Sequence, residues 1–260
     1  MMQVMRNNLI WAHKKLFMAE DEIRKHAKAA YKAWNDPHKS WKNKLKETLL
    51  EIVIIVFAVS ISIWLHNWSE QLKDRKEEKE FLTGLRKDLT RDTVEMASDR
   101  ATYKALFNAY RYLREVGVGD KPASNDSLNA YKAFFFNSTL LIPNISRFEG
   151  LKGSGKLDII ENKDLLNLIL DLYQENIPSL QLFNQSFSEF KRNSLSVYVD
   201  AHAVLNNRDS IINLPEMLRQ PQMRMLLSRG DQVVQNIEYY TICIEKCREI
   251  IREIDKEVKE

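Results

Sequence analysis

Glycine and proline are scarce in this sequence. The 260 residues contain 7 Gly and 6 Pro, and long stretches are dominated by Leu, Ile, Lys and Glu. Because Gly and Pro interrupt helices whereas Leu, Lys and Glu favour them, the composition predicts an all-α protein. A chain of this length can form one membrane anchor and one domain with a proper core.

Cysteine is also rare. Cys243 and Cys247 are the two cysteines, which are too few for a disulfide framework. Their helical i,i+4 spacing would place two sulfur ligands on one helix face. A structural metal site needs about four ligands, however, and no pair of His or Cys completes the set. We therefore interpret both cysteines as core residues.

Motifs of catalysis are missing as well. The five histidines form no H-E-x-x-H pair, and no G-x-S-x-G turn occurs. The segment from Gly150 to Leu157 nearly fits the phosphate-binding pattern G-x-x-x-x-G-K-[ST], but Leu157 replaces the hydroxyl residue that holds Mg²⁺. We expect a glycine turn leading into a helix there. No catalytic residue, cofactor or metal is expected, and the protein is predicted not to be an enzyme.

Positive charge is concentrated in one part of the chain. Residues 1–50 contain eleven Lys and Arg against five Asp and Glu, a net charge of +6, whereas the whole chain carries +3. A basic segment ahead of a mildly acidic body is typical of a membrane-flanking region. Nucleic-acid binding would also use such charge, but no recognition motif accompanies it, so no nucleic-acid partner is expected.

One long apolar run follows the basic segment. No Asp, Glu, Lys or Arg occurs from Ile52 to Ser69. Crossing the hydrocarbon of a bilayer takes about 20 residues, which the run reaches if Glu51 and His66 lie at the interfaces. A core helix is rarely apolar on every face, and the run begins too late for a cleaved signal peptide. We predict a membrane anchor whose principal residues are Ile52, Val56, Val59, Ile63, Trp64 and Trp68.

The anchor divides the chain into three regions. Residues 1–48 form a basic segment in which positions 7–34 have the spacing of an amphipathic helix, which can lie on lipid or pack on a partner. Residues 49–69 form the transmembrane helix, and residues 70–260 form a helical-bundle domain. The basic segment favours a cytoplasmic N-terminus, which places the bundle outside the cytoplasm.

Apolar spacing predicts the helices of the domain. A helix over 70–115 continues from the membrane span and ends at the breakers Gly117, Gly119 and Pro122. A polar loop is expected around the glycines of 150–155. Further helices are expected at 127–141, 162–176, 178–205, 215–228 and 231–259.

The last helix has the most regular repeat in the chain. Its apolar residues keep heptad spacing over four heptads, and they are Val233, Ile237, Tyr240, Ile244, Cys247, Ile251, Ile254 and Val258. The helices at 70–115 and 231–259 can pair within one chain as an antiparallel bundle, or between chains as a coiled coil. Asp92 and Asp99 fall on the seam of the first of these helices. We favour a role in fixing register through buried Lys or Arg partners, and the alternative is a polar pocket.

Two stretches, taken in order, resemble a known family. The first is Glu51-Ile52 at the start of the anchor, followed by Asn67-Trp68-Ser69-Glu70 and a helix of mixed charge. The second is the turn Leu151-Lys-Gly-Ser-Gly-Lys-Leu157. Together they resemble an uncharacterised family of small bacterial single-pass membrane proteins, typical of bacteroidete genomes and known as a domain of unknown function. The family usually has a glycine in mid-anchor, where this chain has Ala58.

The resemblance implies a bacterial inner-membrane protein with a periplasmic helical domain, and it implies no activity. With the heptad seams, it leads us to expect a non-enzymatic interaction or scaffold protein. Such a protein would be an accessory subunit of a membrane complex or a self-assembling oligomer, and its partners would be the lipid bilayer and a protein or further copies of the chain. The alternative is a sensor or ligand-binding bundle, in which the phenylalanines 134–136, Asp92 and Asp99 would line the pocket.

Overall fold

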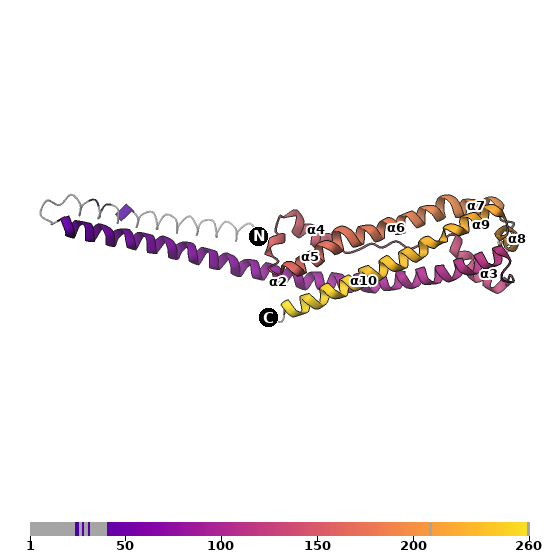
Figure 1. The fold of residues 1–260 in the computed structure, drawn as a ribbon, viewed down its shortest axis with the longest axis horizontal. Coiled ribbons are helices and arrows are strands. Elements are labelled where there is room, and N and C mark those ends of the chain that lie inside the picture. The colour runs from indigo at the N-terminus through magenta and orange to yellow at the C-terminus, as the bar shows by residue number, and fades with distance from the viewer. Residues whose placement is uncertain (1–23, 26–27, 29–30, 32–40, 208–209, 259–260) are drawn as a thin grey trace. The chain divides into compact units, whose positions relative to one another are not determined.

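The structure is a computed structural model, and it describes residues 24–25, 28, 31, 41–207 and 210–258. Over these residues it consists of helices, turns and one isolated β-bridge, so the all-α prediction is confirmed (Figure 1). The chain divides into two compact units, residues 1–74 and 75–260. The amphipathic helix expected at 7–34 lies outside the described residues, apart from the isolated positions 24, 25, 28 and 31.

Helix α2 (Trp41–Val118) carries the apolar run into the domain without a break. Its 78 residues include no proline, so no backbone N–H is missing from the helical ladder. The helix ends as predicted, because Gly119 adopts a positive φ of 88°. The N–H of Asp120 then bonds to the carbonyl of Glu115 at 3.0 Å, which closes the helix with a Schellman motif.

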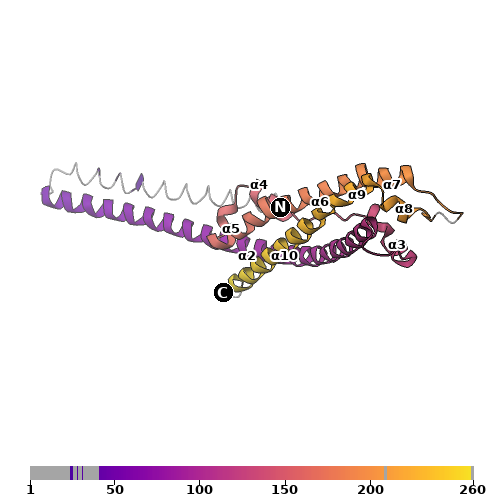
Figure 2. The same cartoon turned by 45° about the vertical axis from the view of Figure 1, so that its right-hand side comes forward.

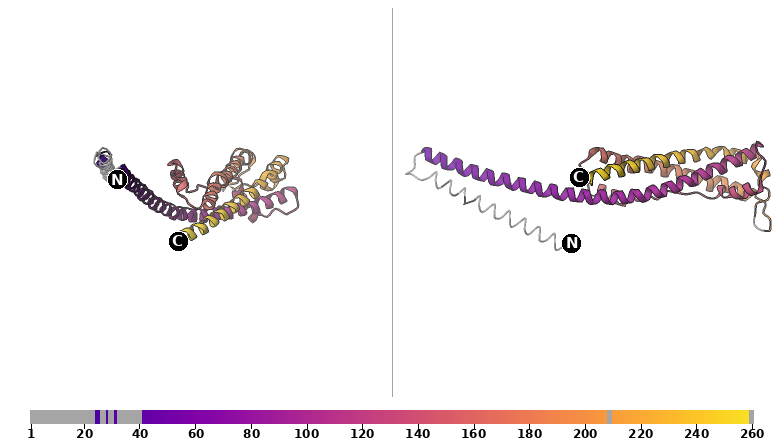
Figure 3. Two further views of the ribbon diagram at one scale, coloured as in Figure 1. Left: turned by 60° about the vertical axis from the view of Figure 1, so that its left-hand side comes forward. Right: turned by 90° about the horizontal axis from the view of Figure 1, so that it is seen from below.

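The second unit contains three long helical stretches that lie side by side (Figure 1, Figure 2, Figure 3). They are α2 from Arg75 onward, the run from α5 (Lys163–Asp171) through α6 (Ile177–Phe190) to α7 (Ser196–His202), and α10 (Gln232–Glu257). The first two point the same way, and α10 returns antiparallel to both. We call the two ends of this bundle the Arg75 end and the Val118 end.

The run from α5 to α7 corrects a prediction. We expected a break between helices at Pro178, but the helix passes through it. The reason is the π turn η3 (Leu172–Asn176), where the N–H of Ile177 bonds to the carbonyl of Leu172. This wider turn lies just before Pro178 and accommodates a residue that has no N–H and whose ring would clash with the previous turn. A second π turn, η4 (Lys191–Leu195), joins α6 to α7.

Because α2 and the α5–α7 run are parallel, the chain must return between them. It forms α3 (Asn125–Tyr131) and the 3₁₀ turn η1 (Lys132–Phe135) at the Val118 end. Residues 137–145 then run back along the bundle without regular secondary structure to α4 (Ser146–Gly153). We call residues 137–145 the crossover segment. The helix predicted at 127–141 was therefore wrong beyond Phe135, because backbone groups of Asn137, Leu141 and Asn144 bond to side chains of the bundle.

The glycine stretch is the third correction. Gly150 and Gly153 lie inside α4 and not in a loop. Gly155, at a φ of 70°, ends the helix, with Lys156 N–H bonded to the Leu151 carbonyl at 3.3 Å. The glycines thus terminate a helix and do not lead into one. The short elements η2 (Leu157–Ile159), α8 (Leu214–Leu218), α9 (Pro221–Ser228) and η5 (Arg229–Asp231) complete the domain.

Candidate functional site

The predicted anchor residues are all exposed. In α2, the stretch that is long and apolar enough to cross a membrane has none of its side chains buried in the structure. This applies to each predicted anchor position, namely Ile52, Val56, Val59, Ile63, Trp64 and Trp68. The rings of Trp64 and Trp68 stack, with centroids 6.3 Å apart. A surface this apolar on every side matches the environment of lipid hydrocarbon better than that of water.

The seam of α10 is buried within the chain. Tyr240, Ile244, Cys247 and Ile254 are fully buried, whereas Ile237, Ile251 and Val258 are partly buried at its edge. The buried stripe also takes in Val233, Asn236, Cys243 and Ile250, so the seven-residue repeat is kept, at positions 233, 240, 247 and 254 and at positions 236, 243 and 250.

The partners of α10 belong to the same chain. Arg86 on α2 forms an ion pair with Asp255 at 2.6 Å, and Arg100 donates to the hydroxyl of Thr241 at 3.2 Å. α10 also packs along α5 and α6. The two helices with heptad spacing therefore pair with each other as antiparallel neighbours inside one bundle.

Asp92 bonds to the crossover segment near the end that leads into α4. It is fully buried, and its carboxylate accepts the backbone N–H of Asn144 at 3.2 Å and the side-chain amide of Asn144 at 2.5 Å. Burial raises the pKa of Asp92, and the bonds from Asn144 oppose that shift. Its partner is an asparagine, so the expected pairing with Lys or Arg was wrong.

Asp99 belongs to a polar network in the middle of the bundle. Its carboxylate accepts a hydrogen bond from the hydroxyl of Thr139 at 2.7 Å. The Tyr240 hydroxyl lies 3.1 Å from the other carboxylate oxygen of Asp99 and 2.8 Å from the side-chain oxygen of Asn184. Asn184 accepts the backbone N–H of Leu141 at 3.2 Å, and its amide donates to Asn236 at 2.6 Å. The network thus links α2, α6 and α10 to the crossover segment.

Lys191 completes this set, and sequence reasoning missed it. It is 2% exposed, its ammonium donates to the carbonyl of Asn137, and it lies 4.9 Å and 5.3 Å from the ring centroids of Phe134 and Phe187. Burial lowers its pKa to about 8. The only sequence signal was a Lys at a position where the period of α6 requires an apolar residue.

One physical cause accounts for the buried polar side chains of the described chain, which are Asp92, Asn184, Lys191 and Asn236. An extended segment without a neighbouring strand leaves its backbone N–H and C=O groups unpaired, which costs free energy when they are buried. Asp92, Asn184 and Lys191 bond to the backbone of the crossover segment, and Asn236 fixes Asn184. These residues therefore act as structural clamps on the crossover segment.

The first bundle turn of α2 contacts the segment after α4 at the Arg75 end. Lys156, in the turn after α4, pairs with Glu77 of α2 at 2.6 Å. Glu161 pairs with Arg75 at 3.4 Å, and its backbone N–H donates to Glu78 at 2.8 Å. Surface ion pairs of this kind contribute little each, about 0–1 kcal/mol. Together, these contacts hold the first bundle turn of α2 against the segment that follows the glycine turn.

The described residues include neither a cluster of metal-ligating side chains nor a cysteine with a lowered pKa. No group of three or more His, Cys, Asp or Glu among them can hold a metal ion. Cys243 and Cys247 are fully buried, and burial raises the pKa of each thiol to about 12, so neither forms a thiolate near neutral pH. Phe134 and Phe135 lie in the core, whereas Phe136 is exposed and lines a shallow depression beside α7.

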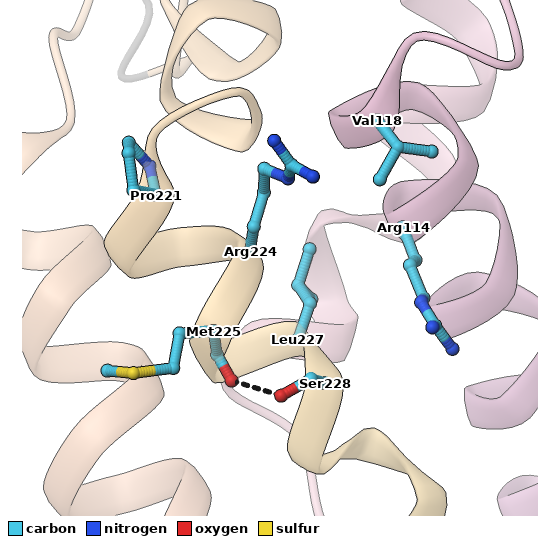
Figure 4. A pocket seen from close by; sticks show the side chains of 7 residues that line it. All are labelled: Arg114, Val118, Pro221, Arg224, Met225, Leu227 and Ser228. Atoms are coloured by element: carbon cyan, nitrogen blue, oxygen red, sulfur yellow. Dashed lines mark hydrogen bonds between the residues drawn. The ribbon is translucent and has the colours of Figure 1, made fainter.

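A cleft at the Val118 end combines charge with apolar surface, and we call it the arginine cleft (Figure 4). Its volume is about 380 Å³. In Figure 4, Arg224 extends from α9 toward the α2 wall that carries Val118 and Arg114, and Leu227 lies between the two walls. The full lining is Arg114, Val118, Pro221, Arg224, Met225, Leu227 and Ser228.

On the α2 wall of the arginine cleft, hydrogen bonds hold the Arg114 side chain in place. The Arg114 guanidinium donates to the Tyr110 hydroxyl at 3.3 Å, and that hydroxyl donates to Asp231 at 3.1 Å. Burial raises the pKa of Tyr110, so the hydroxyl keeps the proton that it donates. Gly230 lies against the Tyr110 ring so closely that a Cβ there would overlap it. The glycine therefore allows the contact that positions Arg114.

Comparison with known proteins adds no identity. No family model, no curated protein and no solved structure matches this chain. The function must therefore be argued from the arrangement of the chain itself.

Proposed function

We propose that this protein is a membrane-anchored, non-enzymatic interaction protein that serves as an accessory subunit of a membrane complex. The observation that carries the proposal is the unbroken helix α2, which joins an exposed apolar span to the first helix of a packed bundle. Such a helix fixes a folded domain at the membrane. The basic residues before the span favour a cytoplasmic N-terminus, which puts the bundle on the periplasmic side of a bacterial inner membrane.

The packing of α10 bears on the kind of assembly. A self-assembling coiled coil would need an exposed apolar seam, but Tyr240, Ile244, Cys247 and Ile254 are already buried inside one chain. Pairing this seam between chains would first require the bundle to open, which exposes those side chains at about 1.5–3 kcal/mol each until they are buried again. We therefore favour a different protein as the partner, bound through the outer surface of the bundle.

Most of the residues considered for a sensor pocket do not support that alternative, and only Phe136 lines a depression, a shallow one beside α7. Asp92, Phe134 and Phe135 are buried, and Asp92 has its carboxylate bonded to Asn144. A side chain that is already packed and bonded offers no free group to a ligand.

The test is the mass and composition of the intact complex, purified in mild detergent from native membranes. We expect a second protein at fixed stoichiometry. Masses at multiples of 30.6 kDa with no second protein would support self-assembly instead. A monomer without any partner would refute the interaction role.

A further inference from the structure

The arginine cleft has the composition of a protein-binding surface. Its charged side chains are both Arg, its apolar ones include Met225 and Leu227, and it contains no Lys, Asp or Glu. Arg, Met and aromatic residues are enriched in protein interfaces, whereas Lys, Glu and Asp are depleted. The surrounding segment 214–230 has three Arg and one Glu, an excess of positive charge.

The two guanidinium groups are available to an anion. The Arg224 side chain has no hydrogen bond or ion pair with any residue that the structure describes. Arg114 donates to the neutral hydroxyl of Tyr110 and keeps further N–H groups for a ligand. The Tyr110–Asp231 contact holds the Arg114 side chain in place before anything binds, which reduces the entropy lost on binding.

The shape of the arginine cleft favours a protein over a small molecule. Sites for small molecules bury most of the ligand surface in an enclosed cavity. Here Val118 is 44% exposed and Met225 is 59% exposed, and Leu227 alone forms a buried floor at 2%. An open depression of about 380 Å³ can receive one or two side chains that project from a larger surface.

We propose that the arginine cleft is the docking surface for the partner subunit, and that it receives a segment of that protein in which acidic and apolar side chains are adjacent. The acidic groups pair with Arg224 and Arg114, and an apolar side chain packs on Leu227 beside Val118. This inference rests on the proposed function, because it names the surface through which the accessory subunit binds.

The experiment uses the full chain in its native membrane. A photoreactive benzophenone amino acid replaces Met225 in the cleft or, as a control, Ile242 on the outer face of α10, which is 45% exposed. Each version is also made with Arg224→Glu or with the control Arg252→Glu, since Arg252 is an exposed cation on α10. After irradiation, cross-linked products are identified by mass spectrometry.

We expect position 225, but not position 242, to cross-link to one other membrane-associated protein through an acidic peptide. Arg224→Glu should reduce that yield about tenfold or more, the loss typical of reversing one partner of an interfacial charge pair. Arg252→Glu should leave it within about twofold.

Three results would overturn the inference alone: an intact complex with no cross-link at 225, a yield insensitive to Arg224→Glu, or an adduct with a second copy of this chain. A native complex that contains no other protein would refute the proposed function as well, so the two failures are distinguishable.

Discussion

Replacing Asp92 by alanine should destabilise the bundle without changing its helix content. The carboxylate accepts two donors of Asn144, the backbone N–H at 3.2 Å and the side-chain amide at 2.5 Å. Alanine accepts neither, and a donor left buried without a partner costs about 1–3 kcal/mol. Removing a buried carboxylate recovers part of that cost. We expect a net loss of about 2 kcal/mol, or a Tm lower by about 4–8 °C for a domain of this size.

The assay is thermal unfolding of the full chain in detergent, followed by far-UV circular dichroism. Asp158→Ala is the control, because Asp158 is an exposed aspartate near the same end of the bundle. In a double-mutant cycle with Asn144→Ala, the coupling energy should be about 1–3 kcal/mol. If Asp92→Ala is as stable as Asp158→Ala, or if the cycle shows no coupling, the clamp account is wrong.

The pH dependence of Asp92 provides an independent check. Its pKa in the folded protein is raised above the ordinary value of 3.8, mainly by burial. The carboxyl group therefore contributes most to stability below about pH 3.8, and that contribution is lost as the pH rises through the folded-state pKa. The stability of Asp92→Asn should gain relative to the natural protein over this rise, and a difference that does not vary with pH would contradict the assignment.

Three further predictions concern other features of the fold. Gly155→Ala should destabilise the bundle by about 1 kcal/mol because the φ of Gly155 is positive. Gly153 lies inside α4 with open space around it, so Gly153→Ala should stabilise the bundle by up to about 1 kcal/mol. The free energy of unfolding of both variants, measured with a chemical denaturant, tests the two signs. Tyr240→Phe should cost about 1–2 kcal/mol by removing the hydroxyl between Asp99 and Asn184, and a Tm equal to that of the natural protein would argue against the network. The pKa of Lys191 is lowered to about 8, so its contribution to stability is present above the unfolded value of 10.5 and is lost as the pH falls through about 8. The stability of the natural protein should therefore rise with pH in this range by up to about 3 kcal/mol, and this rise should be absent from Lys191→Met. The measurement is the Tm of both proteins between pH 7 and 10.

The sequence predicts the features that depend on local pattern. The apolar helical stretch of α2, the end of α2 at Gly119 and the buried stripe of α10 each follow from a local run of side chains. The short-range signals were reliable there because backbone geometry and helical period act over a few residues.

The crossover segment shows why the remainder was not predictable. Its residues 137–145 form no helix because Asp92, Asn184 and Lys191 supply partners to its backbone, and these side chains lie tens of residues away in the sequence. The apolar spacing marks Asp92 as a polar residue on the seam, but we predicted a Lys or Arg partner because of the charge of Asp92. An asparagine that offers both a backbone and a side-chain donor satisfies the same carboxylate, and only the fold brings it there.

The arginine cleft was not predictable for a related reason. Arg114 and Arg224 are separated by more than a hundred positions, and neither belongs to a motif. α8 and α9 were expected as a single helix, so the turn that brings α9 beside the end of α2 was missed. Pro221 opens α9 and marks that turn in the sequence.

The central claim is that α2 crosses a membrane before it enters the bundle, and labelling from one side tests it most directly. Single cysteines are placed at Lys42 and Lys76, on either side of the span, and intact cells are treated with a membrane-impermeant maleimide; the buried Cys243 and Cys247 should not react. The account predicts that the cysteine at position 76 is labelled in intact cells and that the one at position 42 is labelled only after the membranes are opened. Equal labelling of both positions in intact cells, with release of the protein from membranes by alkaline carbonate, would contradict it.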